Sequence, residues 1–389
     1  MTEKLYFNDS FIREFDAKVI SCEASGDTFK VVLDKTAFFP EGGGQKADTG
    51  TIDNAFVFDV QEIDGIIYHF TDKALSVGFM CRCSINWDVR FRRMQNHSGE
   101  HIVSGIVHST YGYDNVGFHM DDDYVTVDFS GELTREQLDE IEDKANSAIY
   151  SNYKINCFFP DEASLDSFNY RSKLDLTENV RLVEIENTDL CACCAPHLRS
   201  TGEVGIIKIL DFMRHRGGVR IVMKSGIDAL LDYREKYKSV YEVSGLLSAK
   251  QGEISSAVER LQTENDNLRR EFYQFRMSVA DNAKSNLVEC GDCSYSIVSG
   301  FDADMMRDVA NFGAEKSTAS LVYSGTDEDG YSYIICSHSL DLRKLGKFHN
   351  ESLNGRGGGR DSMIQGKCTA NKDDIVSFIN TLNAGDFRL

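Results

Sequence analysis

The sequence predicts an α+β protein made of several domains. Its 389 residues exceed what one hydrophobic core usually organises. Short β-type runs fill residues 1 to about 85, helix and strand signals alternate up to residue 225, and a continuous helical pattern follows. We therefore expect four parts: a small β-barrel domain (1–88), an α/β domain (89–225), a long helix of coiled-coil type (226–283) and a small α/β domain (284–389).

Short strands broken by glycine and aspartate are expected throughout the first part. They are placed at Lys18–Ala24, Thr28–Asp34, Phe56–Glu62 and Gly65–Phe70. The segment TAFFPEGGGQKADTG (36–50) interrupts them, and its three consecutive glycines can adopt positive φ and lie close to a ligand. A hairpin loop is the plainer interpretation. The polar Thr36, Gln45 and Asp48 beside the glycines leave a binding role open.

The second part carries the strongest chemical signal. In NHSGEHIVSG (96–105), His97 and His101 are four residues apart, which on a helix puts both rings on one face. In CACCAPHLRS (191–200), Cys193 and His197 have the same separation. Three imidazoles and a thiolate form a suitable tetrahedral ligand set for zinc. Either pair is weak evidence alone, and together they predict one zinc ion per chain.

The same residues allow two other interpretations. HSGEH also fits HxxEH, the inverted zinc-peptidase signature, with Glu100 as general base and Glu184 or Glu186 as a third ligand. A site closed by four protein ligands is usually structural, whereas a hydrolytic zinc keeps a position for water. An RNA-binding or dimerising protein with a structural zinc is therefore the other alternative.

A heptad pattern runs through the third part. Apolar residues recur at alternating spacings of three and four between Leu247 and Val279. Asn265 occupies an inferred a position, where a polar residue can fix register and favour dimers. We expect one long helix, and a homodimer formed through it or through the C-terminal domain. An antiparallel helical hairpin would show the same pattern.

The fourth part is expected to hold three strands and a terminal helix. These are placed at Ser294–Ser299, Ser320–Tyr323, Tyr331–Ser337 and Asp373–Leu382. Its unusual feature is the glycine-rich segment GRGGGRDSMIQGK (355–367), which lies in a window with an excess of basic residues.

Composition restricts the class of protein. A net charge of −20 argues against a general nucleic-acid binder, although basic residues gather around 90–93, 214–224 and 343–367. Eleven cysteines in a chain of this length do not form a disulfide scaffold. No apolar run reaches the roughly 20 residues of a membrane helix, and the N-terminus lacks a signal-peptide core. We expect a cytoplasmic protein with no membrane partner.

Four motifs in a fixed order carry a resemblance to a known family. FFPEGGGQ…DTG, RMQNHSGEH, CCAPH…TGEVG and GRGGGR…QG together resemble the free-standing alanyl-tRNA editing proteins of the AlaX family, over essentially the whole chain. The chain resembles the long form, which carries a C-terminal DHH-associated domain, and the family is related to the editing domain of alanyl-tRNA synthetase. The resemblance implies ATP-independent, zinc-dependent hydrolysis of serine or glycine from mischarged tRNA(Ala).

The resemblance also implies roles for particular residues. Zinc would be held by His97, His101, Cys193 and His197, with Cys191 and Cys194 as alternative sulfur donors. The glycines Gly42, Gly43 and Gly44 and the side chain of Gln45 would lie against the aminoacyl adenosine, and Asp128 would organise the pocket. Thr36 would read the serine hydroxyl and His119 would orient water, a structural histidine being the alternative. Docking of tRNA would use Arg356, Gly357, Gly358 and Arg360. The family usually shows Cys-Gly-Gly-Thr-His where this chain has CCAPH (193–197).

Overall fold

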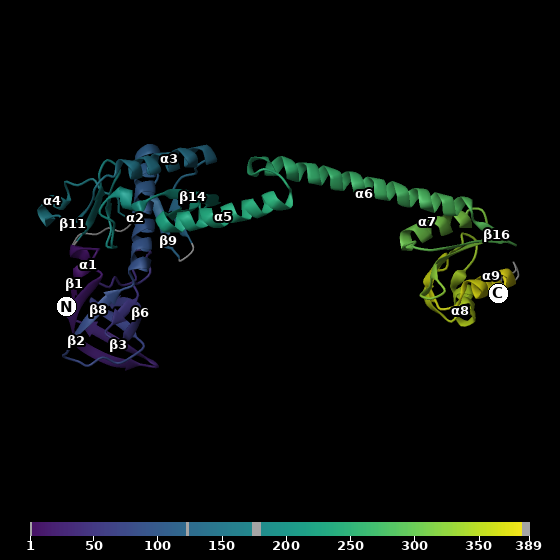
Figure 1. Cartoon of the computed structure of the whole chain (residues 1–389), viewed down its shortest axis with the longest axis horizontal. Helices are drawn as coiled ribbons and strands as arrows, with labels where there is room; N and C mark the ends of the chain where they lie inside the picture. The colour runs from purple at the N-terminus through teal and green to yellow at the C-terminus, as the bar shows by residue number, and fades with distance from the viewer. Residues whose placement is uncertain (1, 122–123, 173–179, 383–389) are drawn as a thin grey trace. The chain divides into compact units, whose positions relative to one another are not determined.

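The computed structural model describes residues 2–121, 124–172 and 180–382 and divides the chain into two compact units. Unit 1 is Met1–Glu242 and unit 2 is Val243–Leu389. Both units contain helices and sheets, labelled in Figure 1, so the prediction of an α+β protein with several domains is confirmed. The finer division into four parts stays a prediction. No helix among the described residues is long and apolar enough to cross a membrane.

Six strands of unit 1 close into a barrel in the order β2-β3-β7-β6-β5-β8. They are β2 (Glu14–Ser25), β3 (Thr28–Leu33), β5 (Gly50–Ile52), β6 (Ala55–Ile63), β7 (Ile66–Thr71) and β8 (Met80–Ile85). Alternate residues of each strand face inward, as Val31 and Leu33 do on β3 and Cys81 and Cys83 do on β8. The short β1 (Glu3–Lys4) and α1 (Leu5–Asn8) precede the barrel, and β1 pairs with β4 (Lys35–Thr36).

A long helix, α2 (Trp87–Tyr111), leads from the barrel into the rest of unit 1. The Asn86 side chain caps its start, and Gly112 ends it at φ 70°. From Met94 to Val107 all its residues are buried, as in a helix enclosed by a core. Near its start the buried Arg90 forms an ion pair with the buried Asp48 and donates to the Ala37 carbonyl, which ties the helix to the barrel.

Two further sheets of unit 1 surround α2. The four-stranded sheet has the order β14-β15-β10-β9, and the three-stranded sheet has the order β11-β12-β13. Their strands are β9 (Asn115–Met120), β10 (Val125–Phe129), β11 (Ile155–Phe158), β12 (Leu182–Ile185), β13 (Asp189–Ala192), β14 (Ile207–His215) and β15 (Gly218–Ser225). The helices are α3 (Arg135–Ser151), α4 (Glu162–Leu165) and the 3₁₀ helix η1 (Thr201–Val204). Thr134 and Gln137 form a capping box at the start of α3.

The prediction of a single long helix over residues 226–283 is wrong. The structure has two helices, α5 (Gly226–Leu246) and α6 (Ile254–Ser285), separated by a turn and the 3₁₀ helix η2 (Gln251–Glu253). Ser248 adopts a left-handed φ of 50°, and the Ser244 hydroxyl donates to the Ala249 carbonyl at 2.6 Å. A left-handed residue cannot continue an α-helix, so the helix ends there although the apolar spacing continues.

Unit 2 is built on a six-stranded sheet in the order β16-β17-β18-β19-β21-β20. The strands are β16 (Val288–Cys290), β17 (Cys293–Val298), β18 (Ala319–Thr326), β19 (Gly330–Cys336), β20 (Gly355–Gly359) and β21 (Met363–Cys368). The helices are α7 (Ala303–Ala314), α8 (Leu342–Ser352) and α9 (Lys372–Thr381). Leu321 packs with α8 and α9, and Val322 packs with α6 and α7, so each face of the sheet has its own core.

Candidate metal centre

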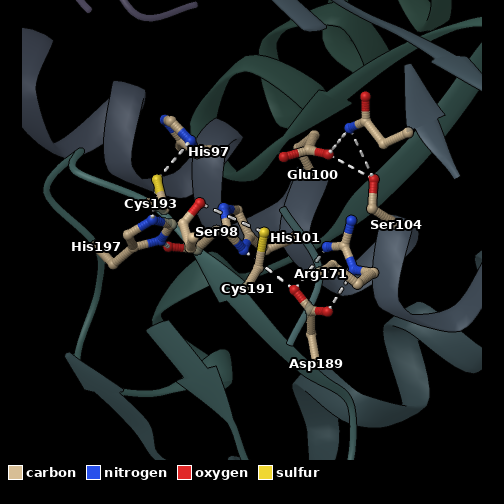
Figure 2. A network of polar contacts seen from close by, with 12 residues as sticks. His97, Ser98, Glu100, His101, Ser104, Arg171, Asp189, Cys191, Cys193 and His197 are labelled. Atoms are coloured by element: carbon tan, nitrogen blue, oxygen red, sulfur yellow. Dashed lines mark hydrogen bonds and ion pairs between the residues drawn. The ribbon is translucent and has the colours of Figure 1, made fainter. Parts of the chain in front are cut away.

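Four side chains from two distant segments meet in the interior of unit 1. His97 and His101 lie one turn apart on α2, and Cys193 and His197 lie in the loop that follows β13. Their ligand atoms all lie within 4.8 Å of one another. The Cys193 Sγ is 3.5 Å from His97 Nε2 and 3.4 Å from His197 Nε2 (Figure 2). The two predicted pairs are therefore brought together.

Each of the three histidines has its Nδ1 atom held by a partner. The partner atoms are Gln45 Oε1 at 3.0 Å from His97, Asp189 Oδ2 at 3.1 Å from His101 and Ser98 Oγ at 3.1 Å from His197. A proton on Nδ1 donates to these oxygens, which leaves the lone pair on Nε2. Partners of this kind fix the ring orientation and the tautomer of histidines that bind metals.

The spacing and protonation of the cluster fit zinc. In a tetrahedral site with zinc–nitrogen distances of about 2.0–2.1 Å and a zinc–sulfur distance of about 2.3 Å, a sulfur and a nitrogen ligand lie about 3.6 Å apart. The two sulfur–nitrogen distances given above are close to that value. Burial raises the pKa of the Cys193 thiol and lowers the pKa of His197. His197 is therefore already in its neutral, metal-binding form, while the thiol gives up its proton when a metal binds.

The glycine loop positions Gln45 against His97. Gly42 and Gln45 exchange two backbone hydrogen bonds of 3.0 Å, and both Gly43 and Gly44 between them have positive φ. This is a two-residue hairpin turn of the type that needs positive φ at both central positions. A Cβ on Gly44 would lie 2.4 Å from the Phe118 ring. The glycines are thus needed for the turn and for its close packing, and Gly43 alone among them lines the cavity described next.

A cavity of about 730 Å³ adjoins the cluster. His97, His101 and Cys193 line it, whereas His197 lies on the closed side and is 1% exposed. The cluster therefore faces an open space through three of its four members. Other residues of the cavity wall bring charge or apolar surface: Lys4, Phe7, Glu62, Glu100, Asn115, Phe118, Phe159, Arg171, Arg181 and Cys191.

Two arginines in the wall, the buried Arg181 and the partly buried Arg171, were not predicted from the sequence. Arg171 makes two hydrogen bonds of 2.7 Å to Asp189, the same carboxylate that holds His101 (Figure 2). Burial raises the pKa of Asp189, but hydrogen bonds from His101 and Arg171 outweigh it and keep the pKa below its ordinary value. Arg181 donates to the carbonyls of Cys193 and Ala195 at 2.9 Å, which shapes the ligand loop. Neither arginine has a spacing that links it to the ligands in sequence.

Comparison with known proteins agrees with the motifs. The family model described as "tRNA synthetases class II (A)" matches residues 7–89, and "Threonyl and Alanyl tRNA synthetase second additional domain" matches residues 180–224. The alanyl-tRNA editing protein AlaX-L of Pyrococcus horikoshii is 28% identical over 96% of this chain and 96% of that protein. The chain is therefore similar to alanyl-tRNA editing proteins over nearly its whole length.

Alanine–tRNA ligases are also similar to this chain, over part of their own length. The alanine–tRNA ligase of Ignicoccus hospitalis is 29% identical over 98% of the chain, which spans 43% of that enzyme. Among solved structures, the C-Ala domain of the Aquifex aeolicus alanyl-tRNA synthetase matches 24% of the chain and 95% of that domain, with 17% identity and a TM-score of 0.21. At that score the structural match carries no argument about the fold.

Several residues that the editing-family resemblance assigned to the site do not line this cavity, and their roles stay predictions. Thr36 is buried in the barrel, where its hydroxyl lies 2.8 Å from His69 Nε2. The His119 side chain on β9 is 62% exposed, and its Nε2 atom lies 3.0 Å from Asp121 Oδ2. Asp128 on β10 makes an ion pair with Arg220. None of the three lines the cavity, and neither does Gly42.

The other residues that the resemblance to the editing proteins assigned lie partly in unit 1 and partly in unit 2. Cys191 lies beside His101 and Asp189, whereas Cys194 is exposed beside Gly43, so Cys193 is the sulfur closest to the three histidines. Arg356, Gly357 and Gly358 belong to β20, the exposed edge strand of unit 2, and Arg360 follows it.

The peptidase alternative lacks its third ligand. Glu184 and Glu186 are exposed on β12 and after it, and neither belongs to a metal-compatible cluster of the described residues. Glu100 is buried and accepts hydrogen bonds of 2.5 Å from Ser104 and Asn115 (Figure 2). An HxxEH peptidase site is therefore not assembled around this helix.

Proposed function

We propose that the chain is a zinc-dependent hydrolase that removes serine or glycine from mischarged tRNA(Ala). One observation carries the proposal: His97, His101, Cys193 and His197 form a zinc-compatible cluster that faces a cavity through three of its members. The relatives support the class of substrate, because they are named as an alanyl-tRNA editing protein and as alanine–tRNA ligases.

The proposed reaction would correct errors that arise because a site for alanine discriminates poorly against glycine and serine. A site that activates alanine cannot exclude the smaller glycine, and it rejects serine only weakly because serine adds a single hydroxyl. A second, hydrolytic site can then remove the wrong products. The free-standing editing protein would perform this step on tRNA that has left the synthetase.

The residues of the site have separable tasks in this proposal. The four ligands hold one zinc ion, which when bound can polarise the ester carbonyl or lower the pKa of a water. Gln45, Asp189 and Ser98 keep the three histidines in the metal-binding tautomer. The Phe7, Phe118 and Phe159 rings supply apolar surface that excludes bulk water from the reacting ester.

Docking of the tRNA would involve unit 2 as well. The exposed strand β20 places Arg356 beside glycines whose backbone a phosphate can approach closely, and Arg360 follows in the next turn. Arginine and backbone N–H groups are common phosphate contacts in protein–RNA complexes. These contacts would offset the net charge of −20 locally.

The test of the reaction is hydrolysis of Ser-tRNA(Ala), Gly-tRNA(Ala) and Ala-tRNA(Ala). We expect wild type to contain one zinc ion and to release serine or glycine while sparing alanine. The variant His97→Ala/Cys193→Ala should lose zinc and lose the activity by at least about a hundredfold. Glu184→Gln, an exposed carboxylate outside the cavity, is the matched control. Zinc-loaded wild type that hydrolyses none of the three esters contradicts the proposal.

A structural zinc is the second candidate, because protein side chains take all four positions of the cluster. In that case removal of zinc by a chelator should unfold unit 1, and the zinc-loaded protein should bind tRNA without hydrolysing it. The two candidates are separated by the ester assay on folded, zinc-loaded protein.

A further inference from the structure

Glu100 is a buried carboxylate of the cavity wall. It is neither a predicted zinc ligand nor a hydrogen-bond partner of the three ligand histidines. It lies on α2 three residues after His97 and one before His101, and it is 4% exposed. Residues three apart on a helix have Cβ atoms about 5–6 Å apart. The Glu100 side chain borders the cavity that His97, His101 and Cys193 also line.

One oxygen of Glu100 is fully engaged and the other is not. Oε1 accepts hydrogen bonds of 2.5 Å from Ser104 Oγ and from Asn115 Nδ2. Asn115 is held in turn, because its Oδ1 accepts from the Gly117 backbone N–H at 3.1 Å. Oε2 accepts no hydrogen bond from any described residue. The network thus fixes the carboxylate and leaves one acceptor for a donor from the cavity (Figure 2).

Two other carboxylates, Glu62 of the cavity wall and Asp189 beside His101, are paired with cations. Glu62 pairs with Lys4 at 2.7 Å, and Asp189 pairs with Arg171 at 2.7 Å. Within the described part of the chain no cation lies within ion-pair distance of Glu100, and the charge of Arg171, which pairs with Asp189, acts on it from farther away. A buried carboxylate is costly unless it is paired and hydrogen-bonded, so this one is suited to a cation brought by the substrate.

We propose that Glu100 binds the α-ammonium group of the aminoacyl ester. This inference rests on the proposed function and deepens it. The α-amino group is bonded to the carbon next to the ester carbonyl, so a carboxylate that binds it must lie beside the groups that act on that carbonyl. Glu100 has this position. It would select esters of amino acids over esters of acids without an amine, and would orient the acyl group.

The test compares two esters that differ only in this group. Nitrous acid converts Ser-tRNA(Ala) into glyceryl-tRNA(Ala), in which a hydroxyl replaces the ammonium. For Glu100→Gln we expect kcat/KM to fall about 10- to 100-fold on Ser-tRNA(Ala), the range for a hydrogen bond between charged groups, and to stay unchanged on glyceryl-tRNA(Ala). Gln keeps an oxygen for Ser104 and Asn115, so the change removes mainly the charge. Glu184→Gln should change neither rate.

Binding gives a readout that does not depend on catalysis. Amides of 3′-amino-3′-deoxyadenosine with serine and with glyceric acid are stable mimics of the two esters. Isothermal titration should show the serine amide binding wild type about 10- to 100-fold more tightly than the glyceryl amide, with the preference lost in Glu100→Gln. Glu100→Asp, which keeps the charge on a shorter arm, should retain part of the preference and serves if Glu100→Gln does not fold.

The outcomes separate this inference from the proposed function. Equal losses on both esters, in a variant with unchanged zinc content and melting temperature, would assign Glu100 to proton transfer or to support of β9 and overturn the inference. Unchanged rates on both esters would overturn it as well. If wild type hydrolyses neither ester, the proposed function fails, and the two amides still decide whether Glu100 recognises an ammonium group.

Discussion

A buried histidine in the barrel shows how one residue couples the fold to pH. His69 is fully buried, and its Nδ1 lies 3.1 Å from the Val31 carbonyl while Nε2 lies 2.8 Å from the Thr36 hydroxyl. With the proton on Nδ1, Thr36 must donate to Nε2. This arrangement needs the neutral ring, and burial lowers the pKa of His69 to about 4.

The stability of unit 1 should therefore fall in mild acid. Between the unfolded pKa of about 6.5 and the folded pKa of about 4, the unfolded chain binds the proton and the folded chain does not, so stability is lost as pH decreases. From pH 8 to pH 5 we expect His69 to account for about 2 kcal/mol. Urea unfolding followed by the fluorescence of Trp87, the single tryptophan, measures this. His69→Gln should lack that share of the pH dependence, and an equal fall in both proteins contradicts the prediction.

Alternation along a strand limits how well single residues of β9 can be assigned from the sequence. Phe118 contacts His97, with ring centroids 4.9 Å apart, while the adjacent His119 points to solvent. Successive side chains of a strand face opposite sides, so a motif that locates the strand does not show which of two neighbours faces the ligands. Thr36 is a similar case, because its sequence position beside the glycines does not reveal its partner His69, which lies 33 positions away.

At the scale of elements, α6 presents an unusual amount of apolar surface. Leu261, Leu268, Phe272 and Phe275 are all more than half exposed. They fall on the heptad positions recognised in the sequence, and each has one charged neighbour in the chain. An exposed apolar seam with this spacing is typical of a helix that pairs with a second copy.

We expect this seam to support a homodimer. Leu268→Asp would bury a charge at a central d position, which should weaken the dimer by at least about 100-fold. Gln274→Asp places the same side chain at an outer position of the same helix and should leave the dimer intact. Light scattering during size-exclusion chromatography measures the mass directly. A monomeric wild type, or equal masses for both variants at all concentrations, contradicts the prediction.

The elements also show which parts of the site were predictable. Both ligand pairs were predicted from a spacing of four. For His97 and His101 this spacing places both rings on one face of a helix, whereas Cys193 and His197 lie in a loop. The partners Gln45, Asp189 and Ser98 required knowledge of which distant segments meet, and the sequence contains no such information. The break between α5 and α6 depends on Ser244 and Ser248, whose hydrogen bonds and left-handed backbone leave the heptad pattern unchanged.

For the whole molecule, the charge distribution predicts how tRNA binding responds to salt. If Arg356 and Arg360 contact phosphates, Arg356→Gln/Arg360→Gln should lower the slope of log affinity against log salt by about 1.5–2. Fluorescence anisotropy with labelled tRNA would give this slope when the salt concentration is raised about fourfold, from about 50 to about 200 mM. Arg343→Gln is the control, since Arg343 already pairs with Asp341 in the same unit. Parallel lines for all three proteins would exclude the two arginines from the interface.

The position of the metal ligands along the chain has a mechanical consequence for unit 1. His97 and Cys193 are 96 positions apart, and the barrel leads directly into the helix that carries the histidines. A bound zinc ion would act as a reversible cross-link that closes a long loop. Such a cross-link stabilises the folded state by lowering the conformational entropy of the unfolded chain, and the effect grows with the length of the loop. A protein nicked by a protease inside this loop would then stay in one piece while zinc is bound, and its fragments would separate once the metal is removed.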